Sequence, residues 1–257
     1  MPSDHLPGAP HIVVPHIVVT MAGRGSRFRA AGYEVPKYAI EVHGRTLFEW
    51  SLLSLRDFTS RSAPVTFVAL REHAVLPFVE RACARLGVSE VNVAEIEEVT
   101  DGQASSVLAA APHLNPDQAL LVYNIDTFVQ PQSLRAAEFR GDGWIPCFPG
   151  LGEGWSFARA DGQARVLEVR EKKRISPHAS VGLYGFSSFG LYSEAYHAYY
   201  ADGQKLERGE KYIAPLYNQL LAWQRPVYLS ELPLAAVHPL GTPDEVRAFA
   251  REAAPVL

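Results

Sequence analysis

The sequence predicts an α/β fold in which helices connect the strands of a mostly parallel sheet. Two observations lead to this prediction. Short apolar runs alternate with segments whose apolar residues recur at helical spacing, as in repeated βα units. The 257 residues are also 47% hydrophobic and 20% charged, the balance of a globular protein with a large core. Because no linker interrupts the chain, we expect a single domain over residues 1–257.

The first strand is expected near the amino terminus. Ile17–Val19 is an apolar run, and the tetrapeptide HIVV occurs twice around Pro15. The second copy is taken as the true first strand, and the first copy is either an edge extension of the sheet or a start-site artefact. Residues 1–10 lack the charged and apolar regions of a signal peptide. We therefore expect residues 1–16 to form a disordered leader.

The rest of the first half alternates between helical and strand patterns, each bounded by turn or capping residues. The pattern predicts, in order, a helix over 46–56 with Thr46 as N-cap, a strand over Val65–Leu70, a helix over 74–86 ended by Gly87, a strand over Val91–Ile96, a turn over 100–103, a helix over 104–111 and a strand over 119–123.

The second half is expected to form a lobe built onto the same sheet. The pattern predicts a strand over 144–148, a hairpin of 155–160 and 164–171 around Asp161-Gly162, a strand over 181–187, helices over 191–200 and 213–223, strands over 227–229 and 234–237, and a closing helix over 243–254.

A glycine-rich loop follows the first strand. Residues 21–27 read Met-Ala-Gly-Arg-Gly-Ser-Arg, and Lys37 comes ten residues after Arg27. A strand that feeds such a loop presents backbone N–H groups to a phosphate, and glycine permits close approach. Residues 21–45 carry a net charge of +3 in a chain of net charge −4. The loop therefore predicts binding of a nucleoside triphosphate.

This loop has two other interpretations. It would otherwise be an ordinary strand-to-helix turn. A dinucleotide-binding fingerprint requires a third small residue, where this chain has Phe28. The cations Arg24, Arg27 and Lys37 favour the triphosphate.

An aspartate lies at the end of a predicted strand. Residues 119–123 run into Asn124-Ile125-Asp126. The carboxyl ends of parallel strands meet at one edge of a sheet, so Asp126 and Gly23 can share a crevice. A carboxylate facing a triphosphate is a suitable Mg²⁺ ligand. The alternative role for Asp126 is a helix N-cap.

Charge and cysteine content exclude several classes of protein. The net charge of −4 provides no overall basic surface for nucleic acid or membrane. Cys83 and Cys147 form neither a disulfide framework nor a metal-ligand spacing, which fits a reducing cytoplasm. No apolar run approaches the length of a membrane span. We therefore expect a cytoplasmic protein whose oligomeric state stays open, a homo-oligomer being compatible with the sequence.

Six segments together resemble the sugar-phosphate nucleotidyltransferases. In chain order they are Gly23-Arg24-Gly25-Ser26-Arg27-Phe28 with Pro36-Lys37, Asp101-Gly102-Gln103-Ala104, Asn124-Ile125-Asp126, Glu171-Lys172, Ser180-Val181-Gly182-Leu183-Tyr184 and Leu240-Gly241-Thr242-Pro243. They cover roughly residues 17–245 in the family's order, and the subgroup they most resemble serves bacterial capsule and surface polysaccharides.

The resemblance implies a fold and a division of labour. The fold would be a three-layer αβα Rossmann-like nucleotidyltransferase fold, with a mostly parallel mixed sheet and an inserted acceptor-binding lobe. Residues 17–140 would form the nucleotide-binding half and residues 141–257 the acceptor-binding half. The reaction would transfer a nucleoside monophosphate from a nucleoside triphosphate to a phosphorylated sugar or similar acceptor and release pyrophosphate, with Mg²⁺ as cofactor.

The resemblance also implies roles for individual residues. Arg27, Lys37 and Asp126 would be catalytic, and Asp126 would hold Mg²⁺. The implied nucleotide-binding residues are Ala22, Gly23, Arg24, Gly25, Ser26, Arg27, Lys37, Asp101, Gly102 and Gln103. The implied acceptor-binding residues are Glu171, Lys172 and Gly182. Lys172 would otherwise be a solvated charge beside Lys173. Residues 210–212 would either line the acceptor pocket or begin a helix.

The chain departs from the family pattern at one position. Relatives often carry a second Mg²⁺-binding aspartate two residues before the Gly-Thr-Pro segment, where this chain has Pro239. Either one carboxylate and the phosphates hold the metal, or His238 or Asp244 contributes. The number of metal ligands is therefore open.

The sequence also leaves the substrates and two other functions open. CTP, dTTP and UTP all fit, with CTP favoured by the subgroup resemblance. A glycosyltransferase that uses a nucleotide sugar would normally show a D-x-D motif, where this chain has Asn124-Ile125-Asp126. A non-catalytic nucleotide-binding module would explain the missing second acid.

Overall fold

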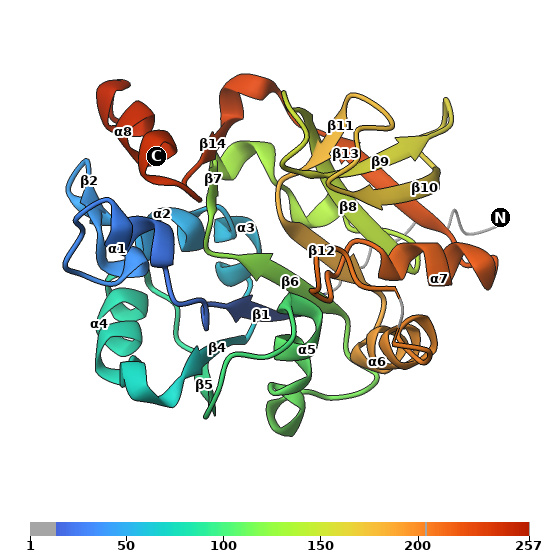
Figure 1. Cartoon of the computed structure of the whole chain (residues 1–257), viewed down its shortest axis with the longest axis horizontal. Coiled ribbons are helices and arrows are strands. Elements are labelled where there is room, and N and C mark those ends of the chain that lie inside the picture. Colours follow the sequence, from blue (N-terminus) through green and yellow to red (C-terminus); the bar gives the residue numbers. More distant parts are fainter. Residues whose placement is uncertain (1–13, 204, 257) are drawn as a thin grey trace, which may run out of the picture.

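A ten-stranded sheet forms the centre of the protein in the computed structural model, which describes residues 14–203 and 205–256. Four neighbouring strands run parallel in the order β6 (Leu120–Asn124), β1 (His16–Thr20), β4 (Val65–Leu70) and β5 (Val91–Ile96). The helices connecting them lie on the two faces of the sheet (Figure 1). This arrangement confirms the predicted α/β fold.

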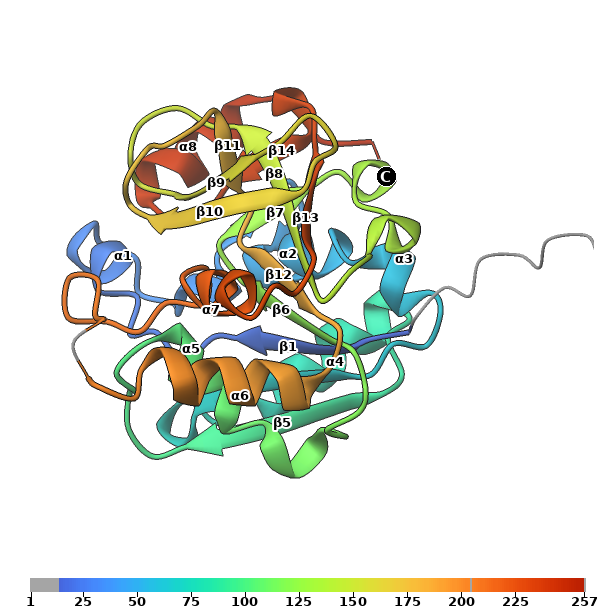
Figure 2. The same ribbon diagram turned by 90° about the vertical axis from the view of Figure 1, so that its right-hand side faces the viewer.

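The second half of the chain extends the same sheet with mostly antiparallel strands. Beyond β6 these are, in spatial order, β12 (Leu183–Phe186), β8 (Gly143–Pro149), β11 (His178–Ser180), β9 (Ser156–Ala160) and β10 (Val166–Glu171), with β13 (Val227–Glu231) pairing parallel to β8. Figure 2 shows these strands stacked above the parallel half. The predicted lobe is therefore continuous with the sheet.

Helices and two small sheets complete the fold. The helices are α1 (Ser26–Ala30), α2 (Leu47–Leu53), α3 (Arg56–Thr59), α4 (Leu76–Leu86), α5 (Gln103–Leu108), α6 (Phe189–Tyr199), α7 (Leu216–Ala222) and α8 (Pro243–Arg251). The small sheets pair β2 (Glu41–Val42) with β3 (Arg45–Thr46), and β7 (Thr127–Val129) with β14 (Val237–Pro239).

The alternation of side chains along β1 produces a core on each face of the sheet. Ile17 and Val19 pack into the cluster formed with α2 and α4, whereas Val18 packs into the cluster formed with α5, α6 and α7. Successive side chains of a strand point to opposite faces, so a strand covered on both faces reads as a continuous apolar run. This explains why the first strand is recognisable from its sequence.

Capping residues define two helix boundaries. Thr46 caps α2, and its Oγ1 accepts from the Glu49 N–H at 3.2 Å while the Thr46 N–H donates to the Glu49 carboxylate at 2.8 Å. This reciprocal capping box confirms the predicted N-cap. Gly87 ends α4 with a φ of 72°, a left-handed conformation that glycine adopts without strain.

Several predicted boundaries are wrong. Helix 46–56 ends at Leu53, and a second short helix, α3, begins at Arg56. Helix 104–111 ends at Leu108, and Ala111–His113 forms a separate 3-10 turn that includes Pro112. Residues 213–215 precede α7, which begins after Pro215. Leu234–Ala236 forms a 3-10 turn, and the strand expected over 234–237 is Val237–Pro239, which pairs with β7.

The expected leader is also shorter than predicted. His16 already belongs to β1, so the leader stops before it. The remainder of the 1–16 leader and most of the first HIVV copy lie outside the described residues.

Cys83 and Cys147 are free and buried, and burial raises the pKa of the Cys83 thiol to about 12. Within residues 14–203 and 205–256, no helix is both long enough and apolar enough to span a membrane.

His16 is expected to make stability depend on pH. It is buried with Nε2 2.8 Å from Thr66 Oγ1, and burial, aided by His113, lowers its pKa from 6.5 to about 4. The unfolded chain therefore takes up this proton more readily, so the contribution is complete above pH 6.5 and is lost as the pH falls towards 4. The full loss is on the order of 3 kcal/mol.

Urea unfolding tests this expectation. Between pH 7 and about pH 5, the free energy of unfolding should fall less for His16→Gln than for the unaltered protein, because glutamine takes up no proton in this range. An identical pH dependence in both proteins would contradict the assignment to His16.

Candidate active site

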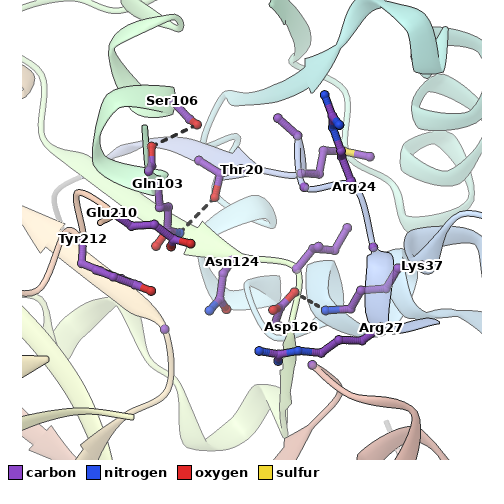
Figure 3. Close-up of a pocket in the computed structure, with 18 of the residues that line it drawn as sticks. Thr20, Arg24, Arg27, Lys37, Gln103, Ser106, Asn124, Asp126, Glu210 and Tyr212 are labelled. Carbon is purple, nitrogen blue, oxygen red and sulfur yellow. Dashed lines mark hydrogen bonds and ion pairs between the residues drawn. The ribbon is translucent and has the colours of Figure 1, made fainter. Parts of the chain in front are cut away.

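A cavity of about 1070 Å³ opens at the carboxyl ends of β1 and β6. It lies where the parallel half of the sheet meets the antiparallel half, a common place for ligands in α/β folds. Figure 3 shows side chains entering it from the glycine loop, from the start of α5 and from the end of β6. All the predicted site residues line this cavity: Ala22, Gly23, Arg24, Gly25, Ser26, Arg27, Lys37, Asp101, Gly102, Gln103, Asp126, Glu171, Lys172 and Gly182.

The glycine loop turns the chain sharply from β1 into α1. Gly25 has a φ of 61° and caps α1, so a side chain there would be strained. The Cβ of Lys37 lies 3.7 Å from the position that a Cβ on Gly25 would occupy. The loop and Lys37 therefore pack together at one wall of the cavity.

Lys37 and Asp126 form an ion pair across this wall. The Lys37 ammonium contacts Asp126 Oδ1, and the lysine side chain is 13% exposed whereas the aspartate side chain is 46% exposed. The ammonium also lies 5.6 Å from the centre of the Phe28 ring. In Figure 3 the Arg27 guanidinium points towards Asp126, while Arg24 points away. The structure thus brings together two cations and a carboxylate that are far apart in sequence.

The turn before α5 is held by a second segment of the chain. Lys211 Nζ lies 2.7 Å from Asp101 Oδ2, and its backbone N–H donates to the Asp101 carbonyl at 2.8 Å. A Cβ on Gly102 would lie 2.3 Å from the Lys211 carbonyl oxygen, so only glycine fits at this position. Gln103 Nε2 donates to Thr20 Oγ1 at 2.9 Å, which ties the turn to the end of β1.

The opposite wall carries a buried acid beside a lysine. Glu171 ends β10 at 8% exposure and accepts from Ser156 Oγ, which also lies 3.0 Å from the Tyr184 hydroxyl. Burial raises the pKa of Glu171, with the nearby Lys172 acting in the other direction. Lys172 Nζ contacts the Tyr212 hydroxyl and lies 4.0 Å from the centre of its ring. Lys173 is exposed and does not line the cavity.

Asn124 and Gly182 meet between the two walls. A Cβ on Gly182 would lie 2.4 Å from the Asn124 amide atoms, and Gly182 has a φ of 82°. Asn124 Oδ1 is buried and finds no hydrogen-bond partner within residues 14–203 and 205–256. An acceptor atom left without a donor is unfavourable, so this oxygen is available to a ligand hydroxyl or amine.

Two alternative metal ligands proposed from the sequence point elsewhere. His238 Nδ1 lies 2.9 Å from the Glu252 carboxylate, and its ring stacks on Phe128. The Asp244 side chain is 90% exposed and pairs with Arg247. In the part of the chain that the structure describes, no group of three or more acidic, histidine or cysteine side chains is arranged around a common metal position.

Comparison with known proteins identifies the family. Residues 17–174, more than half of the chain, match the model of the MobA-like NTP transferase domain. The chain belongs to this family. The structure of a nucleoside-diphosphate-sugar pyrophosphorylase from Vibrio cholerae is similar to it at 37% identity and a TM-score of 0.85, covering 92% of this chain and 100% of that one. No curated protein matches the chain.

A more distant structure shares the fold. The inositol-1-phosphate CTP transferase from T. maritima superposes with a TM-score of 0.71 at 15% identity, over 95% of this chain and 99% of that one. Family membership confirms the resemblance to sugar-phosphate nucleotidyltransferases and the enzyme class, nucleotidyl transfer. The glycosyltransferase and the non-catalytic module are therefore set aside.

Several residues that the sequence motifs do not single out, or leave undecided, line the cavity of this MobA-like enzyme. Residues 210–212 do not begin a helix, so that alternative is wrong. Glu210 and Tyr212 line the cavity. Thr20 and Glu245 also line it. The signal for Thr20 was its place at the end of the first strand. The T-x-x-E spacing of Thr242 and Glu245 predicts only a helix cap, so nothing local in the sequence marks Glu245 as a cavity residue.

Proposed function

We propose that this enzyme transfers a nucleoside monophosphate from a pyrimidine nucleoside triphosphate to a phosphorylated sugar or similar acceptor. It would work in the cytoplasm, supplying activated precursors for surface polysaccharides. The observation that carries the proposal is that cations line opposite walls of one cavity, Arg27 and Lys37 on one side and Lys172 on the other. Two anionic substrates can therefore be held facing each other. We assign residues 17–140 mainly to the nucleotide and residues 141–257 mainly to the acceptor.

The proposed reaction is one in-line displacement. An oxygen of the acceptor's phosphate attacks the α-phosphorus of the triphosphate, a new P–O bond forms, and the bond to the β-phosphate breaks to release pyrophosphate. A phosphate monoester is already an adequate nucleophile, so no general base is needed. Backbone N–H groups of residues 22–26 would hold the β- and γ-phosphates, and Arg27 would neutralise the leaving pyrophosphate. Lys37 would lie near the α-phosphate.

The residues present fit a divalent cation such as Mg²⁺. Asp126 Oδ1 contacts Lys37, which leaves Oδ2 facing Gly241. Oδ2 lies 3.5 Å from the position that a Cβ on residue 241 would occupy. Mg²⁺ is usually bound by one or two carboxylates together with substrate phosphates. When bound, it would supply positive charge against the phosphate oxygens.

Lys172→Ala is expected to weaken acceptor binding selectively. In the unaltered enzyme the Lys172 ammonium would pair with the acceptor's phosphate. We therefore expect its removal to raise the acceptor KM about tenfold, equivalent to the loss of one charged hydrogen bond. The KM for the triphosphate should change little. Steady-state pyrophosphate release measures both constants. Lys173→Ala is the matched control, and an unchanged acceptor KM in Lys172→Ala would contradict the role.

Thermal shift with a panel of triphosphates tests the function itself. A ligand at 100 times its Kd stabilises the fold by roughly 2.7 kcal/mol, which is readily detected. We expect one pyrimidine triphosphate, CTP first among them, to give the largest shift and to depend on Mg²⁺. Phosphorylated sugars and other phosphorylated compounds are then screened by pyrophosphate release. If no triphosphate shifts the melting temperature, the proposal fails.

A further inference from the structure

The two oxygens of the Asp126 carboxylate have different surroundings. Oδ1 is neutralised by Lys37. Oδ2 faces Gly241, which lies between β14 and α8, and is 3.5 Å from the position that a Cβ there would occupy. Oδ1 is thus paired with a cation, and Oδ2 is directed past Gly241 towards the start of α8.

A second carboxylate faces the same glycine. Glu245 Oε2 lies 3.4 Å from the same Cβ position on Gly241, and Glu245 lines the cavity together with Asp126. The two oxygens are therefore separated by no more than the sum of the two distances, 6.9 Å. Two oxygens on one Mg²⁺ lie about 3 to 4 Å apart, a separation that is within this upper limit. A side chain at residue 241 would fill the space between them.

The hydrogen bonding of Glu245 distinguishes it from a capping residue. Thr46 and Glu49 share the same T-x-x-E spacing and form a complete capping box, with the glutamate returning to the Thr46 N–H. At α8 only half of this motif forms, since Thr242 Oγ1 accepts from the Glu245 N–H at 3.3 Å. Within residues 14–203 and 205–256, the Glu245 carboxylate has no hydrogen-bond or ion-pair partner. It is turned to the cavity instead.

We propose that Glu245 is the second carboxylate of the metal site, opposite Asp126 across Gly241. This inference depends on the proposed function, in which Asp126 holds the cation. It explains how the chain compensates for Pro239, whose side chain has no atom that can bind a metal. The acid moves from the strand before the Gly-Thr-Pro segment to the first turn of the helix after it. The neighbouring Asp244 points to Arg247 and is excluded from this role.

Binding of Mn²⁺ to the full chain tests the proposal without relying on activity. Free Mn²⁺ is followed by electron paramagnetic resonance during titration of the unaltered protein, Glu245→Gln, Asp244→Asn and Asp126→Asn. We expect Glu245→Gln to raise the Mn²⁺ Kd at least about tenfold and Asp244→Asn to leave it within about twofold. Adding Pro239→Asp to Glu245→Gln should restore part of the lost affinity. Melting curves without metal confirm that each variant is folded.

The outcomes separate the inference from the function on which it rests. If Asp126→Asn weakens Mn²⁺ binding and Glu245→Gln does not, Glu245 is not a ligand and the proposed function stands. If neither variant weakens binding, the metal site itself is wrong. If Asp244→Asn weakens binding as much as Glu245→Gln, the effect is a general loss of negative charge, and the assignment to Glu245 fails.

Discussion

Asp126→Asn is expected to lower turnover by at least about a hundredfold and to remove its dependence on Mg²⁺. Losing one charge that acts on a developing transition state typically costs that much, and here the same carboxylate is proposed to hold the cation and pairs with Lys37. Because the Asp126 side chain is 46% exposed, little packing is lost and the fold should persist. Pyrophosphate release over a range of Mg²⁺ concentrations measures the effect.

Asp244→Asn provides the control for this variant. It removes the same charge from a side chain that is 90% exposed and paired with Arg247, so its turnover should stay close to that of the unaltered enzyme. Melting curves establish that Asp126→Asn is folded. Normal, Mg²⁺-dependent turnover by a folded Asp126→Asn protein would contradict the proposal that Asp126 holds the cation.

Lys37→Ala is expected to lower kcat by about a hundredfold or more while changing the KM for the triphosphate much less. Lys37 is held in place by Asp126, by Phe28 and by the glycine loop, and its side chain is only 13% exposed. It is therefore a pre-positioned charge beside the place where the α-phosphate gains negative charge. A contact that strengthens only in the transition state affects kcat and not ground-state binding.

Arg45→Ala is the matched control for Lys37→Ala. Arg45 belongs to the same basic stretch, but its guanidinium lies over Trp50, with 5.9 Å between the central carbon and the ring centre, and it does not line the cavity. Steady-state kinetics with saturating acceptor separate kcat from KM. A Lys37→Ala enzyme that loses triphosphate affinity while keeping its kcat would show that Lys37 acts only in binding.

The sequence identified most of the parts of this enzyme but placed some of them imprecisely. The runs 65–70 and 119–123 formed buried strands, because residues covered on both faces are mostly apolar. Residues 91–96 formed β5, a partly exposed strand at the edge of the sheet. Residues 234–237 were misjudged, since a short apolar run fits a 3-10 turn as well as a strand. Only pairing with β7 shows where β14 begins.

For the cavity, the sequence predicted local features but not the contacts between distant residues. The glycine loop, the Gly87 cap and the Thr46 cap could be predicted by themselves, because backbone conformation and capping depend on residues a few positions apart. The family motifs added the expected partners, and the structure places all of them around one space. How these partners contact one another could not be predicted locally.

The sequence by itself determined the α/β class, the glycine loop and the family, since these depend on periodicity and on short motifs. Only the tertiary structure decided that Lys37 pairs with Asp126, that Lys211 holds the turn at Asp101, and that Glu245 faces the cavity while Asp244 does not. Each of these contacts depends on how distant segments are packed and on which way a side chain leaves its helix. Neither property is encoded in the spacing of neighbouring residues.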